Sequence, residues 1–328
     1  MEDKSKQLAV SGYPHIHVKR DTASIMGDVI IGLLPALGFA VWMFGVKSLW
    51  LALTCVAGCV AFEWLFRRAT GRSSTVGDRS AIVTGLILSF TLPAALPLWM
   101  ALIGCFIAII VVKQLFGGLG GNFANPALTA SLALSVTFSV RMNTWPITEK
   151  MASAITDTGA ATEAVSGATP LFLLKQDLGA LPSVTDLLLG RVSGGMGEIC
   201  ALALLIGGIW LIARRVICPL VPLGFLGSIA LIAFLYGRDP LYDIFAGATM
   251  LTAFFMATDP VTSPVRPVGR AIFGIGCGLL TMFIRIYSVF PDGALFAVLL
   301  MELLVPYIDR LTRVRLPRAA RKGGSDEA

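Results

Sequence analysis

The chain has 328 residues, of which 56% are hydrophobic and 14% are charged. Soluble domains carry roughly 25% charged residues, so this composition excludes a water-soluble core, a disordered chain and a coiled coil. The formal net charge of +6 does not indicate a nucleic-acid partner, because the basic residues cluster between apolar blocks and at the two ends, where they act as topology signals.

The apolar residues form blocks of about 18 to 23 residues, the length that crosses a hydrocarbon layer of roughly 30 Å. The predicted fold class is therefore an all-α polytopic membrane protein with about ten transmembrane helices in the lipid bilayer. In chain order the predicted spans are 24–46, 48–66, 81–96, 98–116, 127–141, 197–217, 219–236, 241–258, 271–290 and 293–308.

Two of these spans, 81–96 and 127–141, are short for a full crossing. Pro93 and Pro97 flank the end of the first, and a glycine cluster at 117–121 precedes the second. Unpaired backbone is tolerated at membrane depth only against protein or a cavity, so interrupted segments of this kind often line a functional site.

The basic connections predict that both termini are cytoplasmic. With the N-terminus inside, the loop 67–80 and the turn Arg214-Arg215 fall on the cytoplasmic side. The long segment 142–196, which holds three basic and five acidic residues, then lies outside.

Five spans precede this long segment and five follow it, so the two halves would be inverted relative to each other. No residue-level repeat is visible between them, and inverted symmetry is a geometric possibility only. The predicted organisation is a cytoplasmic N-terminal segment at 1–23, a first membrane half at 24–141, an extracytoplasmic loop at 142–196, a second membrane half at 197–308 and a basic cytoplasmic tail at 309–328.

Several ionisable residues lie in or near the spans, where a central charge costs roughly 2.5 to 3.5 kcal/mol on insertion scales. Glu63, Arg285 and Glu302 lie close enough to span ends for their charged groups to reach the interface, which is the expected outcome for them. Asp28 and Asp243 lie nearer the first turns of helices, where a carboxylate suits the positive end of the helix dipole.

No metal site is predicted. The six cysteines fall in or beside apolar blocks without a CxxC pair, which favours buried free thiols over a zinc site or a disulfide framework. His15 and His17 precede the first span, and two histidines without further ligands favour a structural role at the interface.

The predicted outside loop contains a small-residue stretch, 163–171, in which Thr169 leads into an apolar run. Small residues let a planar ligand or another protein approach the backbone, and a hydroxyl there is accessible to a modifying enzyme. On composition alone the stretch is more typical of an ordinary Gly/Ser/Thr loop.

Within this stretch, Ser166-Gly167-Ala168-Thr169, preceded by the acid Glu163, resembles a flavinylation signature. The signature belongs to the family that contains the D subunit of the Rnf complex and the B subunit of the sodium-pumping NADH:quinone oxidoreductase. In that family it usually begins with aspartate, and glutamate keeps the charge.

Three further motifs are similar to signatures of the same family, in the same order along the chain. The length and the short N-terminal segment favour the Rnf D subunit over its sodium-pump relative. The three motifs are Pro14-His15, Gly117–Ala127 and Thr258–Pro264.

The resemblance implies that Thr169 carries FMN through a phosphoester bond, which a dedicated flavin transferase makes outside the membrane. Ser166, Gly167 and Ala168 complete the attachment signature. The expected partners are this transferase and the other subunits of an Rnf complex.

The resemblance also implies a non-covalent riboflavin near Asn122, Asn125 and Asp259. The glycines of 117–121 permit close backbone approach, and the asparagine amides suit the polar edge of an isoalloxazine ring. The competing interpretation is a tight re-entrant turn with a helix N-cap, because Asn-Pro and Asp-Pro commonly initiate turns.

The function implied by the resemblance is that of a flavin-carrying subunit of an Rnf-type ferredoxin:NAD⁺ oxidoreductase in a bacterial cytoplasmic (inner) membrane. Such a subunit relays electrons through FMN and riboflavin, coupled to Na⁺ or H⁺ translocation. A secondary transporter is the alternative, because about ten spans with interrupted helices are also typical of transporters. A third interpretation, a non-catalytic membrane anchor, predicts that neither Thr169 nor Asp259 matters.

Overall fold

The computed structural model describes residues 21–146, 166–167, 169–176, 181–288, 290 and 292–313. Helices occupy all ten predicted spans, so the all-α polytopic fold class is confirmed. Among the described residues, α1, α2 and α14 are long and apolar enough to cross a membrane, and five shorter apolar helices accompany them. The inverted symmetry of the two halves stays a prediction.

The first half begins where the Asp21 side chain accepts the N–H of Thr22 and caps the first helix. A left-handed Gly45 then turns the chain directly into the second helix. The elements of this half are α1 (Thr22–Phe44), α2 (Val46–Ala69), the 3₁₀ turn η1 (Val76–Asp78), α3 (Ser80–Thr91), α4 (Leu98–Phe106), the π-helix η2 (Ile107–Gln114), α5 (Pro126–Thr137) and α6 (Ser139–Met142).

The short span predicted at 81–96 is a half-helix, because α3 ends at Thr91. Leu92 adopts an extended conformation, as expected for a residue that precedes a proline. Further along, α4 continues into η2, and the N–H of Leu115 donates to the carbonyl of Ile110, five residues earlier. π-Helical turns of this kind occur frequently at functional sites.

The second half contains a broken helix where the sequence predicted one continuous span at 241–258, and that prediction was wrong. The break at 246–248 contains Gly247 with φ of +67°, and a Cβ there would lie 2.7 Å from an Asp292 oxygen. The elements of this half are α10 (Ala201–Ala213), α11 (Leu220–Leu235), α12 (Pro240–Phe245), α13 (Thr249–Leu251), the π-helix η3 (Thr252–Met256), α14 (Pro267–Tyr287) and α15 (Ala294–Leu311).

The described parts of the connection between the halves hold β1 (Trp145–Pro146), β2 (Ser166–Gly167), α8 (Pro170–Gln176) and α9 (Val184–Leu189), and β1 and β2 pair antiparallel. The last part of this connection returns into the protein, where the N–H of Gly197 donates to the carbonyl of Phe90 at 2.8 Å. The predicted span at 197–217 is correspondingly shorter, because its helix begins only at Ala201.

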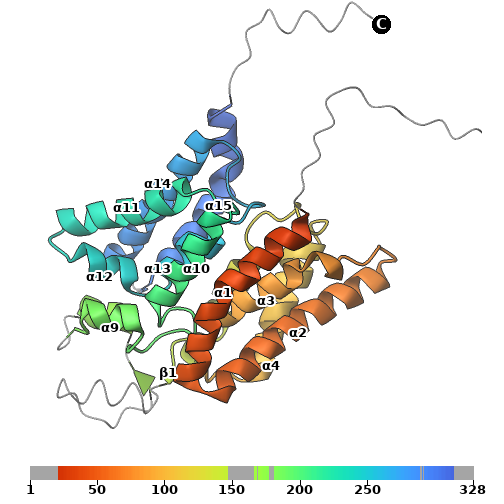
Figure 1. Ribbon diagram of the computed structural model, residues 1–328, viewed down its shortest axis with the longest axis horizontal. Coiled ribbons are helices and arrows are strands. Elements are labelled where there is room, and N and C mark those ends of the chain that lie inside the picture. Colours follow the sequence, from red (N-terminus) through yellow and green to blue (C-terminus); the bar gives the residue numbers. More distant parts are fainter. Residues whose placement is uncertain are drawn as a thin grey trace, which may run out of the picture.

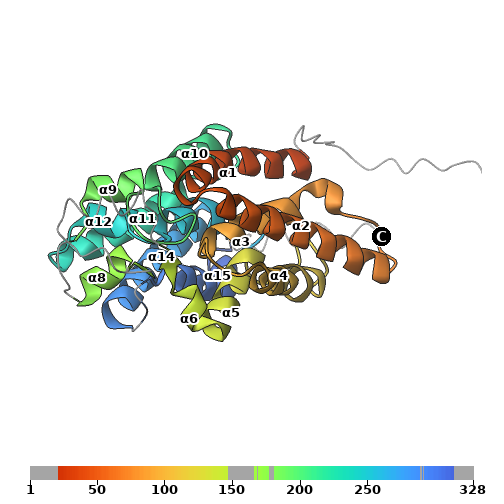
Figure 2. The same cartoon turned by 90° about the horizontal axis from the view of Figure 1, so that it is seen from below.

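The two halves meet along α1 and α10, which pack side by side. Both ends of the described chain emerge at the top of Figure 1, whereas α9 and β1 lie at the opposite end of the helices. Figure 2 shows α3, α4 and α5 grouped on one side of this seam, and α11, α12 and α14 on the other.

The seam between α1 and α10 depends on close backbone contact at Gly207. A Cβ at this position would lie 2.0 Å from the carbonyl oxygen of Gly32, so the backbone would have to move. We expect Gly207→Ala to destabilise the protein by about 1–3 kcal/mol through overpacking, measured as a lower apparent melting temperature in detergent.

Gly227→Ala is the matched control, because a Cβ there meets open space. Alanine also stabilises a helix relative to glycine by about 0.5–1 kcal/mol, so this variant should not lose stability. Equal melting temperatures for the Gly207 and Gly227 variants would contradict the close packing of α1 against α10.

Candidate cofactor sites

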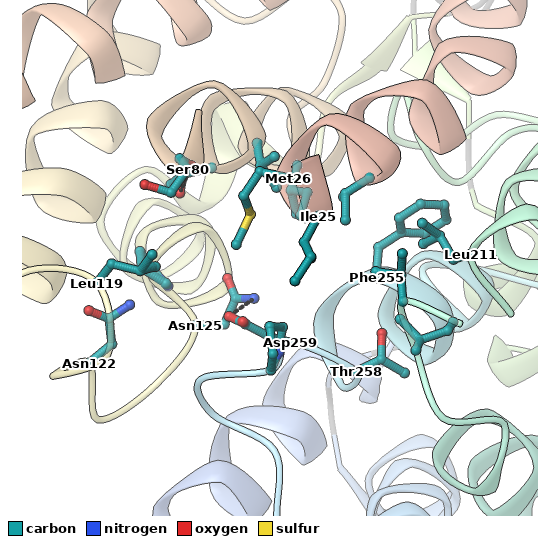
Figure 3. Close-up of a pocket in the computed structure, with 18 of the residues that line it drawn as sticks. Ile25, Met26, Ser80, Leu119, Asn122, Asn125, Leu211, Phe255, Thr258 and Asp259 are labelled. Carbon is teal, nitrogen blue, oxygen red and sulfur yellow. Dashed lines mark hydrogen bonds between the residues drawn. The ribbon is translucent and has the colours of Figure 1, made fainter. Parts of the chain in front are cut away.

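A cavity of about 660 Å³ lies between the two halves, and we call it the Asn–Asp cavity because Asn122, Asn125 and Asp259 line it. Its apolar wall includes Met26 of α1 and Phe255 of η3. Figure 3 shows Asn125 and Asp259 next to each other at this cavity, with Asn122 on the neighbouring loop.

Asn125 is held by contacts to both halves of the protein. Its backbone N–H donates to Oε2 of Glu302 at 2.8 Å, and its Nδ2 donates to Oδ2 of Asp259 at 3.3 Å. Its Oδ1 accepts the N–H groups of Ala127 and Leu128 and so caps α5. The turn-and-cap interpretation is therefore correct for this residue, and the same side chain also lines the cavity.

The three residues that the resemblance assigned to riboflavin thus come together, although Asp259 is 134 residues away from Asn125. Oδ1 of Asn122 is buried and has no hydrogen-bond partner among the described residues. A buried, unpaired amide oxygen is costly, so an N–H donor on a bound molecule would satisfy it. The polar groups present fit the donor and acceptor edge of a flavin ring.

The glycine cluster lets the loop before Asn122 fold back tightly. Gly118 has φ of +97°, and a Cβ there would lie 2.5 Å from Nη2 of Arg67. A Cβ on Gly121 would lie 2.2 Å from the carbonyl oxygen of Phe116. Residues with larger side chains would therefore displace the loop that carries Asn122.

Glu63, Arg285 and Glu302 do not reach the interface, so that expectation was wrong. All three are buried, and each is neutralised or hydrogen-bonded inside the protein. Arg285 contacts the carboxylates of Asp243 and Asp292 where α12 and α13 separate. Charges this deep persist only with partners, which the linear sequence does not reveal.

Glu63 pairs with Lys113, a cavity-lining residue that was not predicted from the sequence. Nζ of Lys113 lies 2.9 Å from Oε2 of Glu63, and the two side chains are 1% and 0% exposed. A lysine within an otherwise apolar predicted span was the available signal. Asp28, near the start of α1, pairs with the half-exposed Arg214.

A second cavity of about 810 Å³ lies on the β1 side of the bundle and is lined by Thr169, so we call it the Thr169 cavity. Its polar lining includes Ser131, whose hydroxyl is buried without a partner among the described residues. Glu198 and Asp292 add carboxylates, and aromatic rings from Trp145, Phe290 and Phe296 also line it.

Thr169 directly precedes α8, and its Oγ1 accepts the N–H of Phe172 at 3.3 Å. Ser166 and Gly167 form β2, in which Gly167 pairs with Trp145. Ala168 and Glu163 lie outside the described residues, as do Pro14, His15 and His17. The attachment signature and the second cavity therefore coincide at Thr169.

The half-helix α3 and the short helix α5 line both cavities. On α3, Ile87 lines the Asn–Asp cavity and Thr91 lines the Thr169 cavity. On α5, Pro126 lines the Asn–Asp cavity and Ser131 lines the Thr169 cavity. With a rise of 1.5 Å per residue, these positions are about 6 to 8 Å apart along each helix. Groups bound in the two cavities would therefore lie at opposite ends of the same two helices, α3 and α5.

Five of the six cysteines are buried and the sixth is partly buried; all six are free thiols, as predicted. The described residues contain no cluster of three or more His, Cys, Asp or Glu that could hold a metal ion.

Fold and sites together define a polytopic helical membrane protein with two cavities that residues of both halves line. The chain belongs to the NQR2, RnfD, RnfE family, whose model matches residues 9–317. It is 46% identical to the D subunit of a Na⁺-translocating ferredoxin:NAD⁺ oxidoreductase complex from Acetobacterium woodii, over 94% of this chain and 95% of the relative.

Two more distant relatives match over the same extent. The chain is 37% identical to the D subunit of an ion-translocating oxidoreductase complex from Halorhodospira halophila, over 94% of this chain and 95% of the relative. It is 34% identical to the D subunit of a proton-translocating ferredoxin:NAD⁺ oxidoreductase complex from Clostridium ljungdahlii, over 94% and 96% of the two chains.

Asn125 should be important for stability as well as for the cavity. Asn125→Ala removes the cap of α5 and the contact with Asp259, and loss of an N-cap alone costs about 1 kcal/mol. We expect a lower apparent melting temperature in detergent. Asn143→Ala, which removes one exposed contact to the Ser139 carbonyl, should melt like the wild type. Equal effects of the two substitutions would contradict the role of Asn125.

Proposed function

We propose that this protein is a flavin-carrying membrane subunit of an Rnf-type, ion-translocating electron-transport complex. Membership of the family and the names of the relatives support an oxidoreductase subunit. The observation that carries the flavin proposal is the convergence of Asn122, Asn125 and Asp259 on one cavity and the position of Thr169 at another.

In this proposal Thr169 carries covalent FMN, attached by a flavin transferase through the signature that begins at Glu163. The Thr169 cavity receives the FMN ring, and its hydroxyl and aromatic side chains offer hydrogen bonds and stacking surfaces. The connection 142–196 is extracytoplasmic, and both termini lie on the cytoplasmic side of a bacterial inner membrane.

The Asn–Asp cavity binds a non-covalent riboflavin. The Asn122 amide can donate to a ring carbonyl and accept from a ring N–H, because its Oδ1 has no partner among the described residues. Oδ1 of Asn125 caps α5, and its Nδ2, which Asp259 orients, has one N–H left to donate to a ring carbonyl. A bound flavin supplies one- or two-electron transfer. The protein's contribution is to hold the two rings at the ends of α3 and α5 and to exclude water from the path between them.

Electrons then pass through this subunit between other members of the complex, and their passage is coupled to Na⁺ or H⁺ translocation. The chain has no complete active site of its own in this proposal, because the donor and the acceptor bind elsewhere in the complex.

A secondary transporter without a redox cofactor is the competing function. The break between α12 and α13, with the buried Arg285 beside it, is a feature of transporters as well. Such a transporter has no use for a flavin on Thr169, so covalent flavin distinguishes the two proposals.

Thr169→Ala tests the attachment residue. When the protein is produced together with an active flavin transferase, the wild type should retain flavin fluorescence in a denaturing gel, because a phosphoester survives denaturation. Thr169→Ala removes the acceptor hydroxyl, and the fluorescence should be lost completely.

The matched control is Thr144→Ala, which alters an exposed threonine in the same connection and should keep full fluorescence. Fluorescence in Thr169→Ala equal to the wild type would rule out this attachment residue. A wild type without fluorescence, despite an active transferase, would favour the transporter.

A further inference from the structure

A continuous series of hydrogen bonds connects the loop before α3 with the Asn–Asp cavity. Oδ1 of the partly exposed Asp78 accepts the Ser80 hydroxyl at 2.6 Å. Oγ of Ser80 in turn accepts a proton of the Lys113 ammonium at 2.6 Å. Ser80 and Lys113 are both buried, and both line the cavity. Figure 3 shows Ser80 across the cavity from Asn125 and Asp259.

Glu63 is the counter-ion of Lys113 inside the protein. Its two carboxylate oxygens lie 3.1 and 2.9 Å from Nζ of Lys113, and Thr75 and Gln114 donate further hydrogen bonds to it. The ammonium therefore has a counter-ion on one side and the Ser80 hydroxyl on the other. All three links of the series carry exchangeable protons.

We propose that Asp78, Ser80 and Lys113 form a proton route from solvent to the molecule bound in the Asn–Asp cavity. The inference rests on the proposed function, in which that molecule is a flavin. A flavin takes up protons when it is reduced, and titratable residues that line the site can deliver them. Proton transfer is thus assigned to three residues that are not among the proposed flavin-binding residues Asn122, Asn125 and Asp259.

Asp259 is the other titratable group that lines the cavity, and its carboxylate oxygens are held by hydrogen bonds. Oδ1 of Asp259 accepts the N–H of Val261, and Oδ2 accepts the Asn125 amide. Neither partner titrates. The carboxylate of Glu302 lies behind Asn125 and contacts its backbone N–H and the Thr262 hydroxyl. The series through Ser80 joins the buried ammonium of Lys113 to the partly exposed carboxylate of Asp78.

Full reduction of one flavin consumes two electrons and two protons, and the electrons come from a reduced redox carrier of the complex. For each proton, an N–H bond of Lys113 breaks as an N–H bond forms on the ring. Lys113 recovers a proton from the Ser80 hydroxyl, Ser80 from protonated Asp78, and Asp78 from a hydronium ion of the solvent, which leaves as water.

The test uses the full chain with Thr169→Ala, so that only non-covalent flavin remains. The purified protein is mixed with dithionite in H₂O and in D₂O, and the bleaching of the flavin absorbance is followed by stopped flow. Ser80→Ala removes the central hydroxyl. We expect the rate of flavin reduction to fall at least about tenfold, because a positioned proton donor typically contributes a factor of about 10²–10⁴. The ratio of the rates in H₂O and D₂O should increase.

Three variants make the result specific. Asp78→Asn keeps the Oδ1 acceptor for Ser80 but cannot bind the proton, so it should slow reduction as Ser80→Ala does. Ser80→Thr keeps a hydroxyl and should restore the rate. Ser89→Ala removes a buried hydroxyl of the same helix that donates only to the Leu86 carbonyl and lines neither cavity, and it should leave the rate unchanged.

Unchanged rates and isotope ratios in Asp78→Asn and in Ser80→Ala, with flavin still bound, would overturn the proton route and leave the proposed function intact. If Ser80→Ala fails to fold, Asp78→Asn decides. A parent protein that retains no non-covalent flavin would overturn the riboflavin proposal itself, and the route with it.

Discussion

The contact between the backbone N–H of Asn125 and the buried carboxylate of Glu302 holds the candidate site together. It joins the start of α5 in the first half to α15 in the second, at a depth where neither group can rely on water. Because α5 begins at this point, the Asn125 amide faces Asp259 and the glycine loop returns beside it. The Asn–Asp cavity therefore exists only where the two halves are docked against each other.

Interrupted helices create both cavities. The ends of α3, α5 and η3 leave backbone and polar side chains inside the bundle, which is tolerated where protein or a cavity satisfies them. Buried charges follow the same rule, because Lys113 has Glu63 and Arg285 has Asp243. The protein thus concentrates its polar groups at two places that are connected by α3 and α5, and apolar surface remains for lipid and for other subunits.

Hydropathy predicted the helical fold because long apolar blocks have few alternatives in a membrane. It missed the break at Gly247, since Ala246, Gly247 and Ala248 look like any apolar run. The pairing of Glu63 with Lys113 depends on tertiary packing over 50 residues, so the sequence shows a lysine in an apolar span but not its partner. The site residues Asn122, Asn125 and Asp259 were found through the family resemblance, and the structure then placed them around one cavity.

In the proposed function one chain carries two flavins, one covalent and one not. The most direct measurement is the flavin content of the purified wild type, produced with a flavin transferase, before and after acid precipitation. We expect two flavins per chain, one remaining in the precipitate and one released as riboflavin. No flavin in either fraction, with the transferase shown to be active, would contradict the proposal.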